Sequence, residues 1–446
     1  MEYQCSNCDY SSVKWLGRCP RCGEWDSFIE VGKNDKEEDG VSKPTPKPLS
    51  EIEADTRERR ATRIDELDRV LGGGLVAGSV CLFGGEPGTG KSTLLLQTAA
   101  NLAESGNILY ISGEESIEQV KIRSTRLGLN HSQLFVFNGR HIDQALDHVN
   151  DIDPLCIIVD SVQSLAKTGS SAALGTTKQI QQVTGKCVRV AKKEHISLLL
   201  IGHITKSGEF AGPKSIEHLV DSTFYLETTT NPEIRILRPQ KNRFGSTKEL
   251  GLFQMTDEGL EEIGNPSEFF ATQHPSDEIS RNGCCVVCTL EGNRPILAEI
   301  QALVGPASGN SRPQRKVTGL DPNRVSLLLA VLEKQLQLDI GRYDIYLNVV
   351  GGFHLQDPAV DLGVVGSILS SYADTPIDPS SILIGEVGLN GEVRPIPRIS
   401  SRVQEGHKLG YKKAYIPSEA GETIDSLRTF GLTDVADLVD SLDMSL

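Results

Sequence analysis

Short apolar runs alternate with amphipathic stretches along the middle of the chain, from about residue 56 to residue 265. Apolar runs of this length predict buried strands, and the amphipathic stretches predict helices packed against them. The predicted strands are 80–83, 108–112, 134–137, 155–160 and 197–203. A helical pattern covers 94–102, and further helices are predicted at 117–127 and 141–150. This alternation is typical of an α/β fold with a largely parallel sheet.

A second block with the same alternation covers residues 275–446. Its predicted strands lie around 284–290, 294–304, 343–350 and 381–387, and its predicted helices cover 323–338 and 360–373. Residues 31–55 are instead charged and proline-bearing, which is typical of a flexible linker. We therefore expect four parts: a module at 1–30, a linker at 31–55, one α/β domain at 56–265 and another at 275–446.

The glycine-rich segment between the first predicted strand and its helix reads G-E-P-G-T-G-K-S, from Gly85 to Ser92. It fits the phosphate-loop pattern G-x-x-x-x-G-K-[ST], and a chance glycine-rich turn would not be flanked by both a strand and a helix. Backbone N–H groups at the helix N-terminus would bind phosphates, Lys91 would reach the β- and γ-phosphates, and Ser92 would help hold Mg²⁺. The predicted ATP-binding residues are Gly85, Glu86, Pro87, Gly88, Thr89, Gly90, Lys91, Ser92 and Thr93.

Two carboxylates follow predicted strands of the same domain. Asp160 ends the apolar run 155–159, a position suited to holding Mg²⁺ through water. Glu114 and Glu115 follow the strand 108–112, where a carboxylate could orient or deprotonate the water that attacks ATP. Acids are common in first helical turns, which fits Glu115 better. We therefore predict Glu114, together with Lys91, as the catalytic residues.

Four cysteines near the start of the chain form two C-x-x-C pairs: Cys5, Cys8, Cys19 and Cys22. Two such pairs can complete a tetrahedral zinc site, and their spacing suits a zinc ribbon. Two disulfides are the alternative, which a reducing compartment disfavours. Zinc would fold a module too small to fold alone. Trp15 and Trp25 are expected to pack around it.

Composition limits the remaining possibilities. The net charge of −15 argues against a protein that coats nucleic acid by bulk attraction. No apolar run approaches the roughly 18 residues of a membrane span, and residues 1–8 do not resemble a signal peptide. We expect a cytoplasmic protein without a membrane partner.

A local basic strip, Arg235 to Lys248, contains five Lys or Arg residues and no acid. Such a strip could bind nucleic-acid phosphates, insert cations into a neighbouring subunit's ATP site, or simply be a solvated hairpin. Two small, polar loops, 161–178 and 204–215, follow predicted strands and are candidate DNA loops. His203, at a strand end, could sense the γ-phosphate or serve as a local hydrogen-bond partner.

These motifs together resemble the bacterial RadA/Sms family of DNA repair proteins. The phosphate loop, the Asp160 strand and Y-I-S-G-E-E-S around Glu114 look like a RecA-type ATPase core. The stretch Lys241, Asn242, Arg243, Phe244, Gly245 matches the family's K-N-R-F-G signature. The resemblance implies that this motif engages DNA or acts in trans, without dividing those roles between Lys241 and Arg243. It also implies a homo-oligomeric ring, expected to be a hexamer, that moves on single-stranded and branched DNA and promotes branch migration of recombination intermediates. Recombinase and replication-fork proteins are the partners expected.

The C-terminal block resembles a Lon protease domain, in Gly388 to Val393 and in Asp357-Pro358-Ala359. Lon proteases use a Ser–Lys dyad, but 355–362 contains no serine, and Ser400 and Ser401 stand where the lysine belongs. A nucleophile without a base is inert, so we expect no peptidase activity. Residues 308–324 carry Arg312, Arg315, Lys316 and Arg324 and form a second candidate nucleic-acid contact, or a solvated loop. Cys284, Cys285 and Cys288 are interpreted as buried thiols rather than metal ligands.

The leading interpretation is thus a DNA-stimulated ATPase that uses ATP, Mg²⁺ and Zn²⁺. One rival is a RecA-type signalling ATPase, whose turnover would be indifferent to single-stranded DNA. The other is an ATP-dependent peptidase, which the missing dyad disfavours. The fold expected is α/β: a RecA-like phosphate-loop core, an N-terminal zinc ribbon and a Lon-protease-like C-terminal domain.

Overall fold

The computed structural model describes residues 2–5, 8, 10–25, 28–31, 48, 59–203, 216–229, 231–271, 281–307, 313–420 and 427–446. The chain divides into two compact units, Met1–Thr56 and Arg57–Leu446. In the first unit, β1 (Glu2–Cys5) pairs antiparallel with β2 (Ser11–Ser12) and β3 (Phe28–Val31). The predicted linker 31–55 falls almost wholly outside the described residues, and its boundaries, like those of the other predicted domains, stay predictions.

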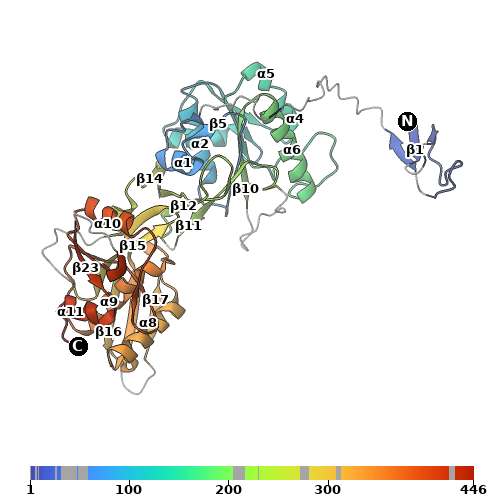
Figure 1. Ribbon diagram of the computed structural model, residues 1–446. Helices are drawn as coiled ribbons and strands as arrows, with labels where there is room; N and C mark the ends of the chain where they lie inside the picture. Colours follow the sequence, from blue (N-terminus) through green and yellow to red (C-terminus); the bar gives the residue numbers. More distant parts are fainter. Residues whose placement is uncertain are drawn as a thin grey trace. The chain divides into compact units, whose positions relative to one another are not determined.

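The second unit begins with a nine-stranded sheet in the order β14-β13-β12-β11-β6-β10-β9-β7-β8 (Figure 1). Its strands are β6 (Val80–Gly85), β7 (Ile108–Ser112), β8 (Leu134–Asn138), β9 (Cys156–Asp160), β10 (Ser197–His203), β11 (Ser222–Thr228), β12 (Ile234–Asn242), β13 (Gly251–Thr256) and β14 (Gly259–Glu262). The six strands from β11 to β8 in this order are parallel, and β12 to β14 extend the sheet as antiparallel neighbours.

Both faces of the parallel part are covered by helices, as the buried strands require. Side chains alternate along β6, so Cys81 and Phe83 enter one core layer while Val80 and Leu82 enter the other. The helices are α1 (Asp65–Leu71), α2 (Lys91–Leu102), α3 (Ile117–Arg126), α4 (Ile142–Leu146), α5 (Val149–Ile152) and α6 (Thr177–Lys193). α1 and α2 contribute to the first layer, and α4 and α6 contribute to the second. A short pair, β4 (Arg59–Arg60) and β5 (Leu75–Val76), flanks α1.

The C-terminal part is built on a seven-stranded sheet in the order β17-β18-β16-β15-β19-β22-β23. Its strands are β15 (Cys284–Glu291), β16 (Arg294–Pro306), β17 (Arg315–Thr318), β18 (Tyr343–Val349), β19 (Ser381–Leu383), β22 (Lys413–Pro417) and β23 (Arg428–Leu432). The helices are α7 (Pro266–Phe270), α8 (Pro322–Gln335), α9 (Asp361–Tyr372), α10 (Ile399–Lys408) and α11 (Val435–Ser441). Short 3-10 turns cover Ile340–Arg342, Val350–Gly352, Pro358–Val360 and Ser418–Ala420.

The strand predicted at 381–387 is two strands in the structure. β20 (Glu386–Val387) leaves the large sheet and pairs with β21 (Val393–Arg394). The break occurs because the backbone of Gly385 bonds outside the sheet, to Ala359 and Leu362. The helix predicted at 141–150 is likewise interrupted, as α4 and α5.

A partly buried ion pair joins the nine-stranded sheet to the C-terminal part. Arg294, at the start of β16, donates to both carboxylate oxygens of Glu66 on α1, at 2.9 and 2.7 Å. The same carboxylate accepts the backbone N–H of Leu252 on β13, and Arg294 also donates to the carbonyl of Gly264. The side chain of Glu66 is buried and that of Arg294 is mostly buried, so these contacts hold the turn between β15 and β16 against the first sheet.

Within the described residues, no helix is both long and apolar enough to cross a membrane.

Candidate functional site

The predicted phosphate loop lies between the end of β6 and the start of α2. Gly90 precedes the helix with a φ of 102°, a conformation that glycine adopts readily, and Lys91 is the first helical residue. The loop therefore ends at a helix N-terminus, where backbone N–H groups lack partners within the helix and can bind an anion. Ser92 and Thr93 follow in the first turn of the helix.

Lys91 is buried against its own loop. Its ammonium donates to the carbonyl oxygens of Gly85 and Glu86, at 2.8 and 2.7 Å, and contacts the hydroxyl of Thr89 at 3.5 Å. Burial lowers the pKa of Lys91 to about 8, although the charges of Asp160 and Glu114 act in the opposite direction. The hydrogen-bond partners found for this ammonium in the described chain are neutral oxygens, so its charge is available to an anionic ligand.

Asp160 lies at the end of β9 and is buried. One of its carboxylate oxygens accepts a 2.6 Å hydrogen bond from the hydroxyl of Tyr110, which is also buried, on the neighbouring strand β7. The pKa of Tyr110 is raised, mainly by its burial, so its hydroxyl keeps its proton. A carboxylate such as Asp160 and a hydroxyl such as Ser92 are oxygen ligands of the kind that Mg²⁺ prefers, so the chemistry of these residues fits the predicted role.

The two glutamates that follow β7 have different partners in the structure. Glu114 accepts a hydrogen bond from the Ser161 hydroxyl at 2.5 Å, and the same oxygen lies 3.3 Å from Nε2 of His203. The hydrogen bond with His203 holds the pKa of Glu114 near 2, despite partial burial, so the carboxylate is ionised at neutral pH. Glu115 instead pairs with Arg123 on α3. The geometry therefore favours Glu114 for contact with a water near the loop and gives Glu115 a local partner.

These groups meet because of the sheet. The neighbouring strands β6, β10, β9 and β7 are parallel, so their carboxyl ends share one edge. That edge carries the phosphate loop, His203, Asp160 and Glu114 in turn, as ligand sites in open parallel sheets do. His203 acts here as a local hydrogen-bond partner of Glu114, the second of the two roles weighed for it.

Sequence reasoning missed Tyr110 and Ser161 as members of this site. A tyrosine within the otherwise aliphatic run Ile108–Ile111 was the available signal, because a buried hydroxyl needs a partner. Ser161 directly follows the predicted Asp160 and carried no comparable signal.

The basic strip does not act as one surface, since its first members face different parts of the molecule. Arg235 is buried, with 7% of its surface exposed, and its Nε donates to the carbonyl of Thr89 in the phosphate loop at 2.9 Å. Arg238 forms ion pairs with Glu291 on β15 and with Glu227 on β11. Neither arginine is a free phosphate ligand, so only the later cations of the strip Arg235–Lys248 stay candidates for a nucleic-acid contact.

Lys241 and Arg243 differ in a similar way. The ammonium of Lys241 donates to the carbonyls of Glu217 and Val220, at 2.6 and 2.7 Å, and partial burial is the main cause of its lowered pKa. The guanidinium of Arg243 is largely exposed, at 64%, and lies 3.7 Å from Asp221. Of the two cations, Arg243 is the one available to a ligand outside the chain.

The other three motif residues hold the turn in place. Asn242 donates to the carbonyl of Val70 and accepts from Ser222 and from the backbone of Phe244. The carbonyl of Phe244 accepts from Arg59 at 2.6 Å. Gly245 packs so closely on Gly72 that a Cβ at Gly72 would lie 2.9 Å from its Cα. The motif is thus anchored to the end of α1.

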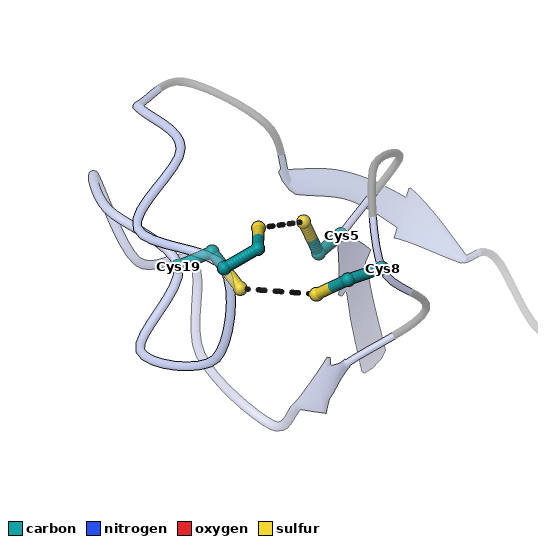
Figure 2. A group of neighbouring side chains, drawn as sticks. Cys5, Cys8 and Cys19 are labelled. Carbon is teal, nitrogen blue, oxygen red and sulfur yellow. Dashed lines mark hydrogen bonds between the residues drawn. The ribbon is translucent and has the colours of Figure 1, made fainter.

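In the N-terminal unit, the four predicted cysteines come together (Figure 2). Their sulfur atoms all lie within 4.8 Å of one another, with Cys5 and Cys22 3.6 Å apart and Cys8 and Cys19 3.5 Å apart. Sulfur ligands of a tetrahedral zinc ion lie about 3.8 Å apart, given Zn–S bonds of about 2.3 Å. The four thiols therefore fit a zinc ion, and at these separations they are not disulfides.

The expected packing of tryptophans around this centre is wrong. The exposed fractions of Trp15 and Trp25 are 52% and 70%. Arg18 lies over the ring of Trp25, 5.6 Å from its centroid. The sulfur cluster is instead packed by Tyr3 and Leu16, because a module this small has little interior for an indole ring.

The remaining candidate contacts are only partly described. Loop 204–215 and Arg312 lie outside the described residues. The first part of loop 161–178 is packed, since Gln179 donates to the carbonyls of Val162 and Leu165. Arg315 and Lys316 are exposed on β17. Arg324 pairs with the buried Asp361, which raises the pKa of Arg324 and removes it from the free cations of 308–324.

The C-terminal part contains a second buried pair where the peptidase dyad would lie. Arg402 is almost fully buried and contacts Asp357 at 2.6 Å while donating to the carbonyl of Cys288. Asp357 also accepts the backbone N–H groups of Leu290 and Ala359. The two charges of this pair therefore have their partners inside the described chain. Cys284, Cys285 and Cys288 lie buried in β15, and burial raises their pKa values, as suits apolar thiols.

The fold and these two centres define the class of protein: a zinc ribbon and a RecA-like ATPase core in an α/β chain. Residues 3–30 match the family described as rubredoxin metal binding domain, and residues 45–209 match the AAA domain family. DNA repair protein RadA of Halalkalibacterium halodurans is 43% identical over 456 residues, covering 100% of this chain and 98% of its own. RadA of Bacillus subtilis strain 168 is 43% identical over 455 residues, with the same coverage. The chain belongs to the family of the DNA repair protein RadA.

The chain is also similar to two solved structures. A KaiC-like protein from Pyrococcus horikoshii covers 46% of this chain and 99% of its own, with a TM-score of 0.39 and 18% identity. The RadB recombinase covers the same shares, with a TM-score of 0.37 and 20% identity. The family assignment follows from the full-length relatives alone.

Proposed function

We propose that this chain is a DNA-stimulated ATPase of recombinational DNA repair. One observation carries the proposal: Lys91, Asp160 and Glu114 gather at one edge of the parallel sheet, beside a loop built to bind phosphates. A cation, a buried carboxylate and an ionised, half-exposed carboxylate are the groups that phosphoryl transfer to water requires. The family relationship supports a role on DNA.

In this proposal each residue of the site has a distinct task. Lys91 exchanges its contacts with the loop carbonyls for contacts with the β- and γ-phosphates. Ser92 and Asp160 would hold Mg²⁺, which supplies charge neutralisation at the phosphates when bound. Glu114 orients the attacking water, while Ser161 and His203 fix the carboxylate in place. Because the pKa of Glu114 is near 2, orientation and charge matter more in its role than strong basicity.

We further propose that the active form is a homo-oligomeric ring, expected to be a hexamer, acting on single-stranded and branched DNA to promote branch migration. Arg243 is the cation of the K-N-R-F-G motif suited to a phosphate of DNA or to a neighbouring ATP site. The parts proposed are the zinc module 1–30, the linker 31–55, the ATPase domain 56–265 and the C-terminal domain 275–446. The C-terminal domain would support the ring without peptidase activity, and recombinase and replication-fork proteins remain the proposed partners.

The decisive experiment measures ATP hydrolysis with and without single-stranded DNA, together with the mass of the assembly in the presence of nucleotide. The expected result is DNA-stimulated turnover by an oligomer larger than a dimer. An ATP hydrolysis rate that does not change when single-stranded DNA is added would instead favour a RecA-type signalling ATPase. Degradation of casein with ATP would revive the peptidase alternative.

A further inference from the structure

Two cationic side chains donate hydrogen bonds to carbonyl groups of the phosphate loop, one from the loop itself and one from a distant strand. A phosphate loop binds its ligand with N–H groups, so its carbonyls must point away and find donors elsewhere. Lys91 satisfies the carbonyls of Gly85 and Glu86 from within the loop. The carbonyl of Thr89 is satisfied by Arg235, 146 residues further along the chain.

Arg235 is held more rigidly than Lys91. Its Nη1 donates to the carbonyls of Pro232 and Ile234, at 2.5 and 3.1 Å, while its Nε reaches Thr89. The backbone around it is hydrogen-bonded on both sides, since β12 pairs with β11 and β13. A planar guanidinium fixed by three carbonyl acceptors keeps one position, whereas a lysine side chain has four rotatable carbons and is free to turn to a phosphate.

We propose that Arg235 is a positioning residue of the nucleotide site, which fixes the Thr89–Gly90 peptide so that the N–H of Gly90 faces the phosphates. If this peptide turned over, the Thr89 carbonyl oxygen would replace that N–H and repel an anion. The inference rests on the proposed function, because it assigns a role at the proposed ATP site.

The predicted effect falls on binding rather than on the chemical step. Arg235 acts through the loop backbone, which contacts the nucleotide in the ground state and in the transition state alike. Removing such uniform binding raises KM and the dissociation constant while kcat stays nearly unchanged. A residue that served only the stability of the fold would change unfolding without changing nucleotide affinity in the molecules that remain folded.

The test measures binding of a fluorescent ADP analogue to the full chain and to Arg235→Ala, Arg235→Lys and Arg235→Gln. Loss of a hydrogen bond from a charged donor predicts about a tenfold or greater rise in the dissociation constant for Arg235→Ala. Lys keeps the charge and Gln keeps an N–H donor, so each should recover part of the affinity. At saturating ATP, kcat should stay within about twofold of wild type.

Arg238→Ala is the matched control, because it removes an arginine from the same strand that faces Glu227 and Glu291 instead of the loop. Its nucleotide affinity should equal that of wild type. Thermal unfolding identifies which variants are folded. If Arg235→Ala does not fold, weaker binding by folded Arg235→Gln decides the matter.

Wild-type affinity in every folded Arg235 variant would overturn the inference, as would an equal loss of affinity in Arg238→Ala. A wild-type chain that binds neither ADP nor ATP gives a different result. That outcome would overturn the proposed function itself, and the inference with it.

Discussion

Two groups of charged side chains, one in each α/β half of the second unit, have opposite kinds of partner. At the edge of the nine-stranded sheet, Lys91 rests on carbonyl oxygens, and Asp160 and Glu114 contact hydroxyl groups and an imidazole. In the C-terminal part, the buried arginine Arg402 has its own carboxylate partner, Asp357. A charge supported by neutral groups can still exchange them for a ligand. A charge neutralised inside the chain cannot do so without breaking the fold.

The largest expected effect comes from removing the cation of the first group. Lys91→Ala should lower ATP turnover about a thousandfold or more, because the loop loses the ammonium aimed at the transferred phosphoryl group. Steady-state phosphate release measures the effect, with thermal unfolding as the control for folding. Turnover like that of wild type would mean that hydrolysis occurs elsewhere.

Breaking the C-terminal pair should instead affect stability alone. Arg402→Met leaves Asp357 without its cation and should lower the free energy of unfolding by about 3–5 kcal/mol. The double variant with Asp357→Asn should regain most of this loss, since both charges are gone. Urea unfolding gives the comparison, and ATP turnover per folded molecule should match wild type in both variants. A loss of turnover in the folded double variant would contradict a purely structural pair.

The next prediction concerns Glu114, the negatively charged member of the group at the edge of the nine-stranded sheet. Glu114→Gln keeps the size and the hydrogen-bonding ability of the side chain but removes its charge. We expect turnover to fall about a hundredfold while nucleotide affinity stays near that of wild type. Glu115→Gln, which changes the glutamate paired with Arg123, is the control. If nucleotide affinity falls strongly in Glu114→Gln, the role of Glu114 is to hold the phosphate loop in place and not to orient the attacking water.

Lys91 should also make nucleotide binding sensitive to pH. Its pKa is lowered to about 8 before a ligand arrives, so the ammonium is charged at pH 7 and largely neutral at pH 9.5. Binding of phosphates favours the charged form, so ADP affinity should fall up to about tenfold per pH unit above pH 8. Titrations from pH 7 to 9.5 measure this. Lys91→Arg should remove the pH dependence, because arginine stays charged. If the ADP affinity of wild type does not change with pH, deprotonation of Lys91 does not control binding in this range.

The smallest expected effects come from Arg243 and Lys241, which should alter DNA binding and stability, respectively. Arg243→Ala should weaken single-stranded DNA binding and lower its log–log salt slope by about 0.7 if one phosphate contact is lost. Stability should not change, since this side chain is mostly exposed. Lys241→Ala should instead destabilise the chain near Glu217 and Val220, by about 1–3 kcal/mol. If Arg243→Ala leaves affinity and slope unchanged, Arg315 and Lys316 become the leading candidates.

The features predicted well from sequence were local ones. The strands Ile108–Ser112 and Ser197–His203 have the predicted bounds. A buried strand is an apolar run that ends at polar residues, and both features can be read directly from the sequence. The cysteine pairs meet as their spacing indicates. The family resemblance is confirmed by relatives along the full chain.

Features that depend on long-range packing could not be predicted in the same way. The five basic residues of 235–248 look alike in sequence, yet Arg235 faces the phosphate loop and Arg238 faces β15. Which face of β12 meets which neighbour is decided by the order of strands, and sequence spacing does not encode that order. The exposed Trp25 shows the same limit, because its position depends on how little interior the small module encloses.

The ion pair between Glu66 and Arg294 has a practical consequence for cutting this protein into pieces. A fragment ending near residue 265 would keep the Glu66 carboxylate and lose the Arg294 guanidinium, so that Arg69, whose Nε lies 3.4 Å from Glu66, would be its remaining ion-pair partner. Poor yield or aggregation of such a fragment would then reflect the loss of the Arg294 contact and would say nothing about its activity. Glu66→Gln is the repair that the contact suggests for anyone who wants the ATPase half on its own, since an amide can still accept the N–H of Leu252.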